Sequence, residues 1–317
     1  MADQTVHAEQ TGRVLTVRLD NPPRNFMTTR MVHELDRLVR ALESDRSVGA
    51  VVLTGAVEDV FITHFDVEEI LRGTERGPSG ISAGTAGGGL RAVGAIQRLP
   101  GGRSLVDRSP VAGVAALLQL HDVFDRMSRL DKVFIAAING LCLGGGCELA
   151  LACDVRLMAD GDHLIGLPEM TVGIIPGGGG TQRLARSLGP ARALEMMLEG
   201  RMLAPREAQE VGLVHHVVDA DALLDRAGET ASRLARRSPV AVAALKRAVY
   251  EGASMPLGAG LHVERAGFLA ASSAPPAKRA MQAYVEQVRR LGDIAPWQAR
   301  ETMAAWQEGT EVDLAEA

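Results

Sequence analysis

The sequence of 317 residues predicts an α/β fold, and two patterns indicate it. Over about the first 200 residues, apolar runs with strand character are followed by segments in which apolar residues recur at helical spacing. Beyond that point one helical pattern follows another. The alternation favours right-handed β-α-β units, and the later change to helices alone indicates a sub-domain boundary.

Strands are expected where short apolar or alternating runs are bounded by turn residues. These runs are residues 13–19, 48–53, 133–138, 154–158 and 163–167. The first helix is expected from a cap at Thr28 or Thr29 to about Glu43, because apolar residues recur on one face of that segment. Two more helices are expected directly after the glycines at 144–146 and at 177–180.

The C-terminal third is expected to be helical. Its apolar spacing predicts helices over 205–211, 220–236, 240–251, 257–271 and 277–290. The chain is therefore divided into a core (1–200), a helical region (201–290) and a C-terminal extension (291–317) with a short helix at 297–306.

Residues 72–113 differ from the rest of the core because they are rich in Gly, Ser and Pro and show weak periodicity. A stretch of that length without strong structure is usually a lid or a flexible insertion. We expect such an insertion or lid here.

Composition narrows the classes of protein to consider. A hydrophobic content of 46% and a charged content of 23% are ordinary for a soluble globular enzyme, and no apolar run is long enough to span a membrane. The net charge of −5, with no long basic run, argues against a nucleic-acid partner. Cys142, Cys147 and Cys153 form no CxxC pair, and the eight histidines show no ligand spacing, so we expect neither disulfides nor a metal site. No signal-peptide pattern is found, so a cytoplasmic location is expected.

The most informative segment is NGLCLGGGCELALACD, residues 139–154. Consecutive glycines allow a ligand to approach the backbone, and a helix that begins after them directs free N–H groups and a positive dipole end to the same place. That place suits a developing negative charge, such as the oxygen of a carbonyl that becomes an enolate. The spacing does not match the phosphate-binding motifs GxxxxGK[ST] or GxGxxG.

Glu148 and Glu169 are candidate proton carriers. Each could instead simply complement the start of a helix or turn. Both stand beside glycine-rich backbone in apolar sequence, however, where loss of water would raise their pKa values into the range useful for acid and base chemistry.

These two segments, residues 139–154 and 166–184 (GLPEMTVGIIPGGGGTQRL), resemble the enoyl-CoA hydratase/isomerase family, also called the crotonase superfamily. The resemblance extends over about residues 11–290. It implies a crotonase-like spiral of β-β-α units with a C-terminal helical trimerisation region, assembled as a homotrimer or a dimer of trimers. It also implies an acyl-CoA thioester as substrate. Because coenzyme A is part of that substrate, no separate cofactor is implied.

The resemblance assigns roles to individual residues. The backbone N–H groups of Phe65 and Gly145 match the pair that holds the thioester oxygen, and Glu148 and Glu169 match the two glutamates that manage water and a proton. The implied reaction is syn addition of water to a trans-2-enoyl-CoA. Six further positions match contacts to the substrate or to CoA: Arg24, His64, Asp66, Gly144, Pro168 and Gly177.

The chain departs from the family in the oxyanion segment, where His64-Phe65-Asp66 replaces a common Gly-Ala-Asp run. A backbone donor tolerates any side chain, but the bulk of His64 and Phe65 would reshape the acyl pocket. We expect His64 to pack or to form a hydrogen bond rather than to carry a proton. The alternatives are therefore a sibling acyl-CoA reaction (isomerisation, dehalogenation or C–C bond cleavage) or a non-catalytic protein of the same fold that acts by binding.

Overall fold

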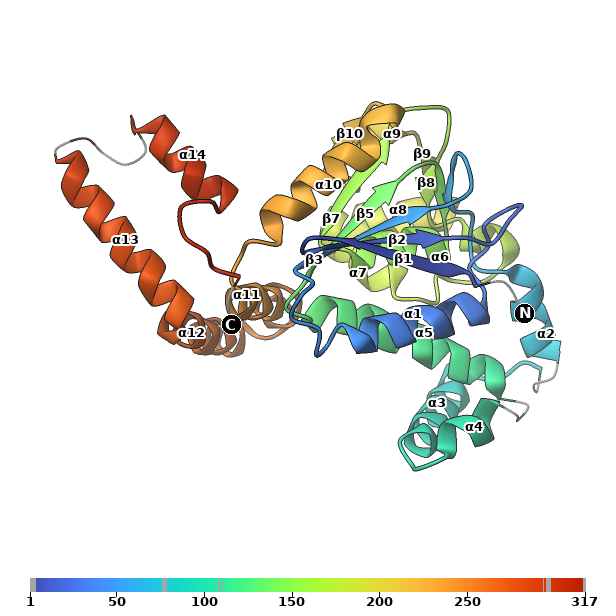
Figure 1. Cartoon of the computed structure of the whole chain (residues 1–317). Helices are drawn as coiled ribbons and strands as arrows, with labels where there is room; N and C mark the ends of the chain where they lie inside the picture. Colours follow the sequence, from blue (N-terminus) through green and yellow to red (C-terminus); the bar gives the residue numbers. More distant parts are fainter. Residues whose placement is uncertain are drawn as a thin grey trace.

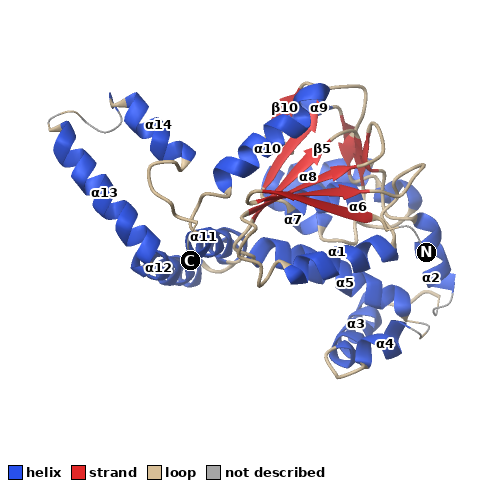
Figure 2. Ribbon diagram, in the orientation of Figure 1, coloured by secondary structure: helices blue, strands red, loops and turns tan. Residues whose placement is uncertain are grey.

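The computed structural model describes residues 4–75, 79–107, 109, 111–292, 294 and 298–315. Its core contains two sheets whose strands alternate along the chain (Figures 1 and 2). The larger sheet has the strand order β1-β2-β3-β5-β7-β10 and is parallel except for the β1–β2 pair. Its strands are β1 (Val6–Thr11), β2 (Val14–Leu19), β3 (Ala50–Gly55), β5 (Val133–Ile138), β7 (Val155–Ala159) and β10 (His216–Val218).

The smaller sheet has the order β4-β6-β8-β9, and β4, β6 and β8 run parallel to one another. Its strands are β4 (Val60–Ile62), β6 (Leu141–Leu143), β8 (Ile165–Gly166) and β9 (Met202–Leu203). Each of β3, β5 and β7 in the larger sheet is thus followed by one strand in the smaller sheet and then by helix. This repeat of two strands and a helix is the spiral that the family resemblance implies.

The central strands are buried on both faces, which explains their uninterrupted apolar sequences AVVLTG (β3) and VFIAAI (β5). Alternate residues of these strands enter two separate apolar clusters because side chains of a strand point to opposite faces. Val51 and Phe134 lie in the cluster that α1 and α5 cover, whereas Val52 and Ile135 pack against α10 on the other face (Figure 1).

The helices that surround the sheets include those that the sequence predicts, and α5 and α8 in addition. They are α1 (Thr29–Ala41), α5 (Ala112–Arg129), α6 (Gly145–Ala152), α7 (Gly180–Leu188), α8 (Pro190–Glu199), α9 (Pro205–Glu210) and α10 (Leu223–Leu234). Short 3-10 turns occur at η1 (Glu169–Val172), η2 (Ala220–Ala222) and η3 (Gly252–Ser254). The Thr28 side chain caps α1 by accepting a hydrogen bond from the Met31 amide, as the sequence predicts. Beyond residue 200, β9 and β10 each pair with a strand of one of the sheets, and α10 packs on the larger sheet.

Residues 72–113 correct the expectation of little regular structure. They contain the end of α2 (Val67–Glu75), then α3 (Ala83–Gln97) and α4 (Gly102–Asp107). Ser82 caps α3 by accepting a hydrogen bond from the Thr85 amide, and Val93 and Val106 pack with Ala115 of α5 in a small apolar cluster of their own. Sequence periodicity misses these helices because small residues, rather than a broad apolar stripe, form most of α3.

The last helices extend away from the sheets (Figure 1). They are α11 (Pro239–Tyr250), α12 (Leu257–Ser273), α13 (Pro275–Leu291) and α14 (Arg300–Glu308). The guanidinium groups of Arg236 and Arg237 donate to the carbonyls of Glu308 and Trp306 (3.0 Å each) at the C-terminal end of α14. Cations suit that end because its carbonyls lack partners within the helix. The helix expected at 297–306 therefore exists as α14, although Trp297 lies outside the described residues.

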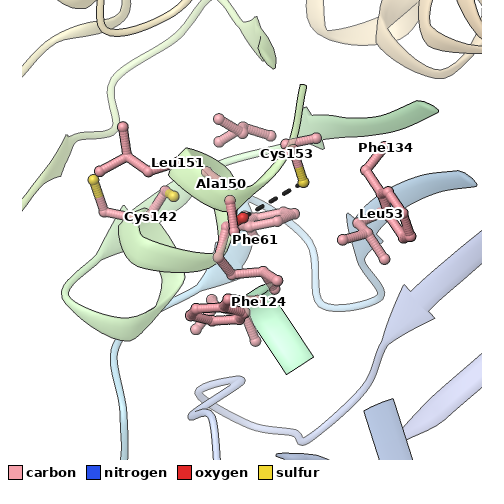
Figure 3. Close-up of a cluster of buried hydrophobic side chains, with 14 of the residues drawn as sticks. Leu53, Phe61, Phe124, Phe134, Cys142, Ala150, Leu151 and Cys153 are labelled. Atoms are coloured by element: carbon pink, nitrogen blue, oxygen red, sulfur yellow. Dashed lines mark hydrogen bonds between the residues drawn. The ribbon is translucent and has the colours of Figure 1, made fainter. Parts of the chain in front are cut away.

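The cysteines are free and buried, as the sequence predicts. Cys142 and Cys153 lie among apolar side chains that include Phe61 and Phe124 (Figure 3), and burial raises the pKa of all three thiols. They act as small apolar side chains that fill the space around α6.

Lys246 joins α11 to the core through a buried ion pair. Its side chain is 7% exposed, and its ammonium donates to the carbonyls of Met127 (2.7 Å) and Lys132 (2.8 Å). It also donates to Asp154 Oδ2 (2.8 Å), an oxygen that accepts the Phe134 amide as well. Burial lowers the pKa of Lys246, and Asp154 opposes that effect.

We expect Lys246→Met to lower the free energy of unfolding by about 3–5 kcal/mol, because it leaves the largely buried Asp154 carboxylate without its cation and two buried carbonyls without this donor. Urea unfolding followed by circular dichroism measures this change. The matched control is Arg247→Met, since Arg247 lies next in sequence but forms only an exposed pair with Glu251, worth about 0–1 kcal/mol. Equal losses in the two variants would contradict the structural role of Lys246.

Candidate active site

The candidate site lies where three neighbouring parallel strands of the smaller sheet end. Phe65 follows β4, Gly145 follows β6 and Glu169 follows β8. Because parallel strands end at the same edge of a sheet, residues far apart in sequence meet here.

Gly144 forms the turn between β6 and α6. Its φ of +48° is strained for residues with a β-carbon, so glycine is required for the chain to turn directly into the helix. The turn is fixed on both sides, because the Gly144 amide donates to Gly166 O (2.9 Å) and its carbonyl accepts from the Glu148 amide (2.9 Å). All residues of α6 are buried, so the start of this helix lies inside the protein.

Two backbone amides lie side by side at the start of α6. Met27 forms a parallel bridge with Phe65: its amide donates to His64 O (2.9 Å) and its carbonyl accepts from the Asp66 amide (2.8 Å). In this arrangement the Phe65 N–H points away from Met27. A β-carbon built on Gly145 would lie 3.3 Å from the Phe65 nitrogen.

Among the residues that the structure describes, neither the Phe65 amide nor the Gly145 amide donates to another protein group. Gly145 is the first residue of α6, where an N–H has no partner within the helix. Two free donors and the positive end of the helix dipole lie together here, an arrangement that favours negative charge.

Glu148 projects from the first turn of α6 and is 3% exposed. Its Oε1 accepts hydrogen bonds from the amides of Gly178 (2.7 Å) and Gly180 (2.8 Å). Burial raises the pKa of Glu148, while these two amides lower it in part. The glycine-rich segment at 177–180 is therefore a cradle for this carboxyl group.

Glu169 begins η1 and faces the same site. Its Oε2 is buried and has no hydrogen-bond partner among the described residues. Burial raises the pKa of Glu169 to about 7, with a smaller contribution from the negative charge of Glu148. A β-carbon built on Gly144 would lie 3.2 Å from Glu169 Oε1 and 3.3 Å from His64 Cβ. Glu169, Gly144 and His64 are thus direct neighbours.

His64 packs rather than presenting a free imidazole. Its ring stacks on Phe26 with centroids 4.7 Å apart, and its Nδ1 lies 2.7 Å from the carbonyl oxygen of Phe65. Since a carbonyl only accepts, Nδ1 carries the proton. This contact agrees with the expectation of a packing and hydrogen-bonding role.

The other sequence-predicted positions surround this centre. Asp66 Oδ1 accepts the Glu68 amide (2.9 Å) at the start of α2, and Pro168 precedes Glu169 at the start of η1. Gly177 belongs to the glycine-rich cradle. Arg24 has an exposed side chain, and its carbonyl accepts a hydrogen bond from Thr63 just before the oxyanion segment.

Sequence reasoning missed two hydrogen-bonding side chains beside the cradle. His121 of α5 contacts the Gly177 carbonyl, and Arg183 of α7 contacts the Gly178 carbonyl. No local motif marks His121. Arg183 follows the glycines by one helical turn, and that spacing is the only signal that the sequence offered.

We expect Gly180→Ala to displace Glu148. A β-carbon on Gly180 would lie 2.9 Å from both Glu148 Oε1 and Leu167 Cδ1, closer than real β-carbons approach other atoms. The expected results are a loss of about 1–3 kcal/mol of unfolding free energy and a fall of at least about 10-fold in turnover. The control is Gly228→Ala in α10, where a β-carbon would meet nothing within 4 Å and alanine favours the helix. Wild-type turnover in Gly180→Ala would show that the cradle does not position Glu148.

Within the described ranges, no group of three or more His, Cys, Asp or Glu side chains could hold a metal ion, and no helix is long and apolar enough to cross a membrane.

The chain is similar to known proteins in both sequence and fold. The family model for enoyl-CoA hydratase/isomerase matches residues 9–87 and 114–291. A short-chain-enoyl-CoA hydratase of Clostridium acetobutylicum is 32% identical over 280 residues, which are 88% of this chain and 94% of that protein. A carnitinyl-CoA dehydratase of Proteus mirabilis is 32% identical over 266 residues (84% and 88%). The crystal structure of an enoyl-CoA hydratase from Bacillus anthracis superposes with a TM-score of 0.72 at 29% identity, and the match covers 90% of this chain and 97% of that one.

Proposed function

The chain belongs to the enoyl-CoA hydratase/isomerase family, and we propose that it is a 2-enoyl-CoA hydratase that adds water syn across the trans double bond of its thioester substrate. The observation that carries this proposal is the pairing of a buried carboxyl group, Glu148, and a partly buried one, Glu169, with two free amides at the start of α6. Hydration needs both a group that activates water and a group that delivers a proton, and the site holds one carboxyl for each.

The amides of Phe65 and Gly145 bind the thioester oxygen in this mechanism. As water attacks Cβ, the carbonyl becomes an enolate and its oxygen gains negative charge. Preorganised donors stabilise that charge, and each is worth on the order of 3 kcal/mol in the transition state. Since neither amide has another partner among the described residues, neither must break a bond in order to bind substrate.

The two carboxyls divide the proton transfers. Glu148 is held by two amide donors that favour its ionised form, so it suits the base that takes a proton from the attacking water. Glu169, with a pKa of about 7, keeps a substantial protonated fraction at neutral pH, and this form gives its proton to Cα. The C–O bond forms at Cβ and the C–H bond at Cα, and exchange with solvent restores both carboxyls. Because the two groups interact, a pH profile reports the pair.

We also propose that the protein assembles as a homotrimer or a dimer of trimers. Large apolar side chains on the projecting helices support this assembly: Leu245 of α11 is 66% exposed, and Phe268 and Leu269 of α12 are 70% and 66% exposed. Sedimentation velocity measures the mass in solution, and a monomer at micromolar concentration would contradict the assembly. The reaction is proposed to need no cofactor, and the proposed location is the cytoplasm, which suits a chain with three free cysteines.

Turnover of crotonyl-CoA and longer trans-2-enoyl-CoAs tests the function. The purified protein should remove the absorbance of the enoyl thioester, and mass spectrometry should find a product heavier by one water. A 3-enoyl-CoA offered in parallel tests for double-bond migration. If the protein isomerises the 3-enoyl substrate and hydrates no 2-enoyl substrate of any length, the hydratase proposal is wrong.

A further inference from the structure

The glycine-rich segment at 177–180 is held from two opposite sides. On one side, the amides of Gly178 and Gly180 donate to Glu148 Oε1 (2.7 and 2.8 Å). On the other side, His121 Nε2 lies 2.7 Å from the Gly177 carbonyl oxygen, and Arg183 Nη1 donates to the Gly178 carbonyl (3.1 Å). Because a carbonyl only accepts, His121 must carry its proton on Nε2.

Both side chains are themselves anchored. Arg183 Nη2 pairs with Asp125 Oδ1 of α5 at 3.3 Å, and the guanidinium lies over the Phe124 ring, 5.6 Å from its centroid. The Arg183 side chain is 19% exposed, and His121 is partly buried on α5, one turn before Asp125. Helix α5 therefore fixes the cradle through His121 directly and through Arg183 indirectly.

We infer that His121 and Arg183 are positioning residues for Glu148. They bind carbonyl oxygens of the 177–180 segment and so hold the segment where its amides can bind the Glu148 carboxyl group. The role in catalysis rests on the proposed hydratase function. Gly178 shows the coupling most directly, because its amide donates to Glu148 while its carbonyl accepts from Arg183. Hydrogen bonds in such a chain polarise one another, so loss of one weakens the next.

The charges around Glu148 add an electrostatic consequence. His121 and Arg183 both lower the pKa of Glu148 against the larger effect of burial. Glu169 faces Glu148 from η1 with like charge, and Asp125 offsets part of the Arg183 charge from α5. Cys147 of α6 is buried and its thiol stays neutral because burial raises its pKa. Removing either side chain should therefore raise the pKa of Glu148.

Pairs of variants separate positioning from packing. His121→Leu and Arg183→Met remove the donors, whereas His121→Gln and Arg183→Lys each keep a donor at a similar position. The expected result is that the first two variants lose about 10- to 100-fold in kcat, because a carboxyl displaced by about 1 Å is a poor base. In these two variants KM should change far less than kcat, and the acidic limb of the kcat–pH profile should move to higher pH. His121→Gln and Arg183→Lys should retain most of the wild-type kcat.

The matched control is Arg186→Gln, which removes an arginine from the same helix. Arg186 donates to Ser254 and Gln182 and does not contact the glycine-rich segment. It should keep the wild-type profile. Wild-type kcat in His121→Leu and Arg183→Met would overturn the inference. It would also be overturned if kcat fell equally in the conservative variants and the acidic limb of the kcat–pH profile did not move.

A measurement without turnover distinguishes this inference from the proposed function. The melting temperature of His121→Leu should depend on pH differently from that of the wild type, and the difference should vanish when both proteins also carry Glu148→Gln. If the wild type hydrates no enoyl-CoA but this coupling is found, the proposed hydratase function is wrong and the positioning of Glu148 by His121 is supported. If hydration is found without the coupling, the positioning role is wrong.

Discussion

Replacing Glu169 with glutamine is expected to lower kcat by about 10²- to 10⁴-fold, the usual contribution of a general acid or base. The amide has nearly the same shape and cannot deliver a proton to Cα. Since the pKa of Glu169 is about 7, one limb of the wild-type kcat–pH profile should lie near neutral pH and should be absent from the residual activity of the variant. Stopped-flow or steady-state hydration assays between pH 5 and 9 measure both effects.

The same substitution should stabilise the protein above neutral pH. Burial raises the pKa of Glu169 from 4.5 to about 7, so between these values the folded protein holds a proton that the unfolded chain has lost. The stability that this proton provides is present at low pH and is lost as the pH rises through 7. At pH 8, Glu169→Gln should therefore raise the free energy of unfolding by about 1–2 kcal/mol, less than the full shift implies because water still reaches part of the side chain.

At pH 4 the gain should disappear, because the carboxyl is then protonated in both states. Glu199→Gln is a suitable control, since Glu199 is an exposed glutamate at the end of α8. An unchanged kcat in Glu169→Gln would remove this residue from the reaction. Equal stability changes at pH 4 and pH 8 would contradict the raised pKa.

Replacing Glu148 should also lower kcat by about 10²- to 10⁴-fold, but its effect on stability should depend on the replacement. In Glu148→Gln the side-chain carbonyl can still accept the amides of Gly178 and Gly180, so the fold should be kept while the base is lost. In Glu148→Ala both buried amides lose their acceptor, which should cost about 2–4 kcal/mol of unfolding free energy.

The two variants thus separate catalysis from structure at one position. Hydration assays should find both equally inactive, whereas urea unfolding should find only the alanine variant strongly destabilised. A glutamine variant with wild-type kcat would show that Glu148 does not act as a base. An alanine variant as stable as the glutamine variant would show that the cradle is held by other contacts.

The sequence was sufficient to predict which residues lie together at the candidate site, because the signals that mark them are local. Glycines at 144–146 and at 177–180 stand beside Glu148 and Glu169, and only glycine permits the backbone to come so close to a carboxyl group. The central strands were equally clear, since burial on both faces leaves an uninterrupted apolar run.

The features that the sequence did not reveal depend on contacts between distant segments. Strand β1 has only Val6 buried, so its sequence carries no alternating pattern, and its position follows from pairing with β2. Helix α3 is formed by small residues that pack on α5. His121 reaches the Gly177 carbonyl across 56 residues, a contact that no spacing rule predicts.

The order of the strands in the smaller sheet has a consequence for how such an enzyme can diversify. The residues of the candidate site follow β4, β6 and β8, whose pairing fixes their mutual geometry, whereas the connection from β4 to β5 spans residues 63–132. Residues 88–113 of that connection lie outside the family match, yet β4 still pairs with β6. The connection between β4 and β5 can therefore change in length and sequence during evolution, together with the surface that it covers. The pairing of β4, β6 and β8 still keeps the residues of the candidate site in the same relative positions.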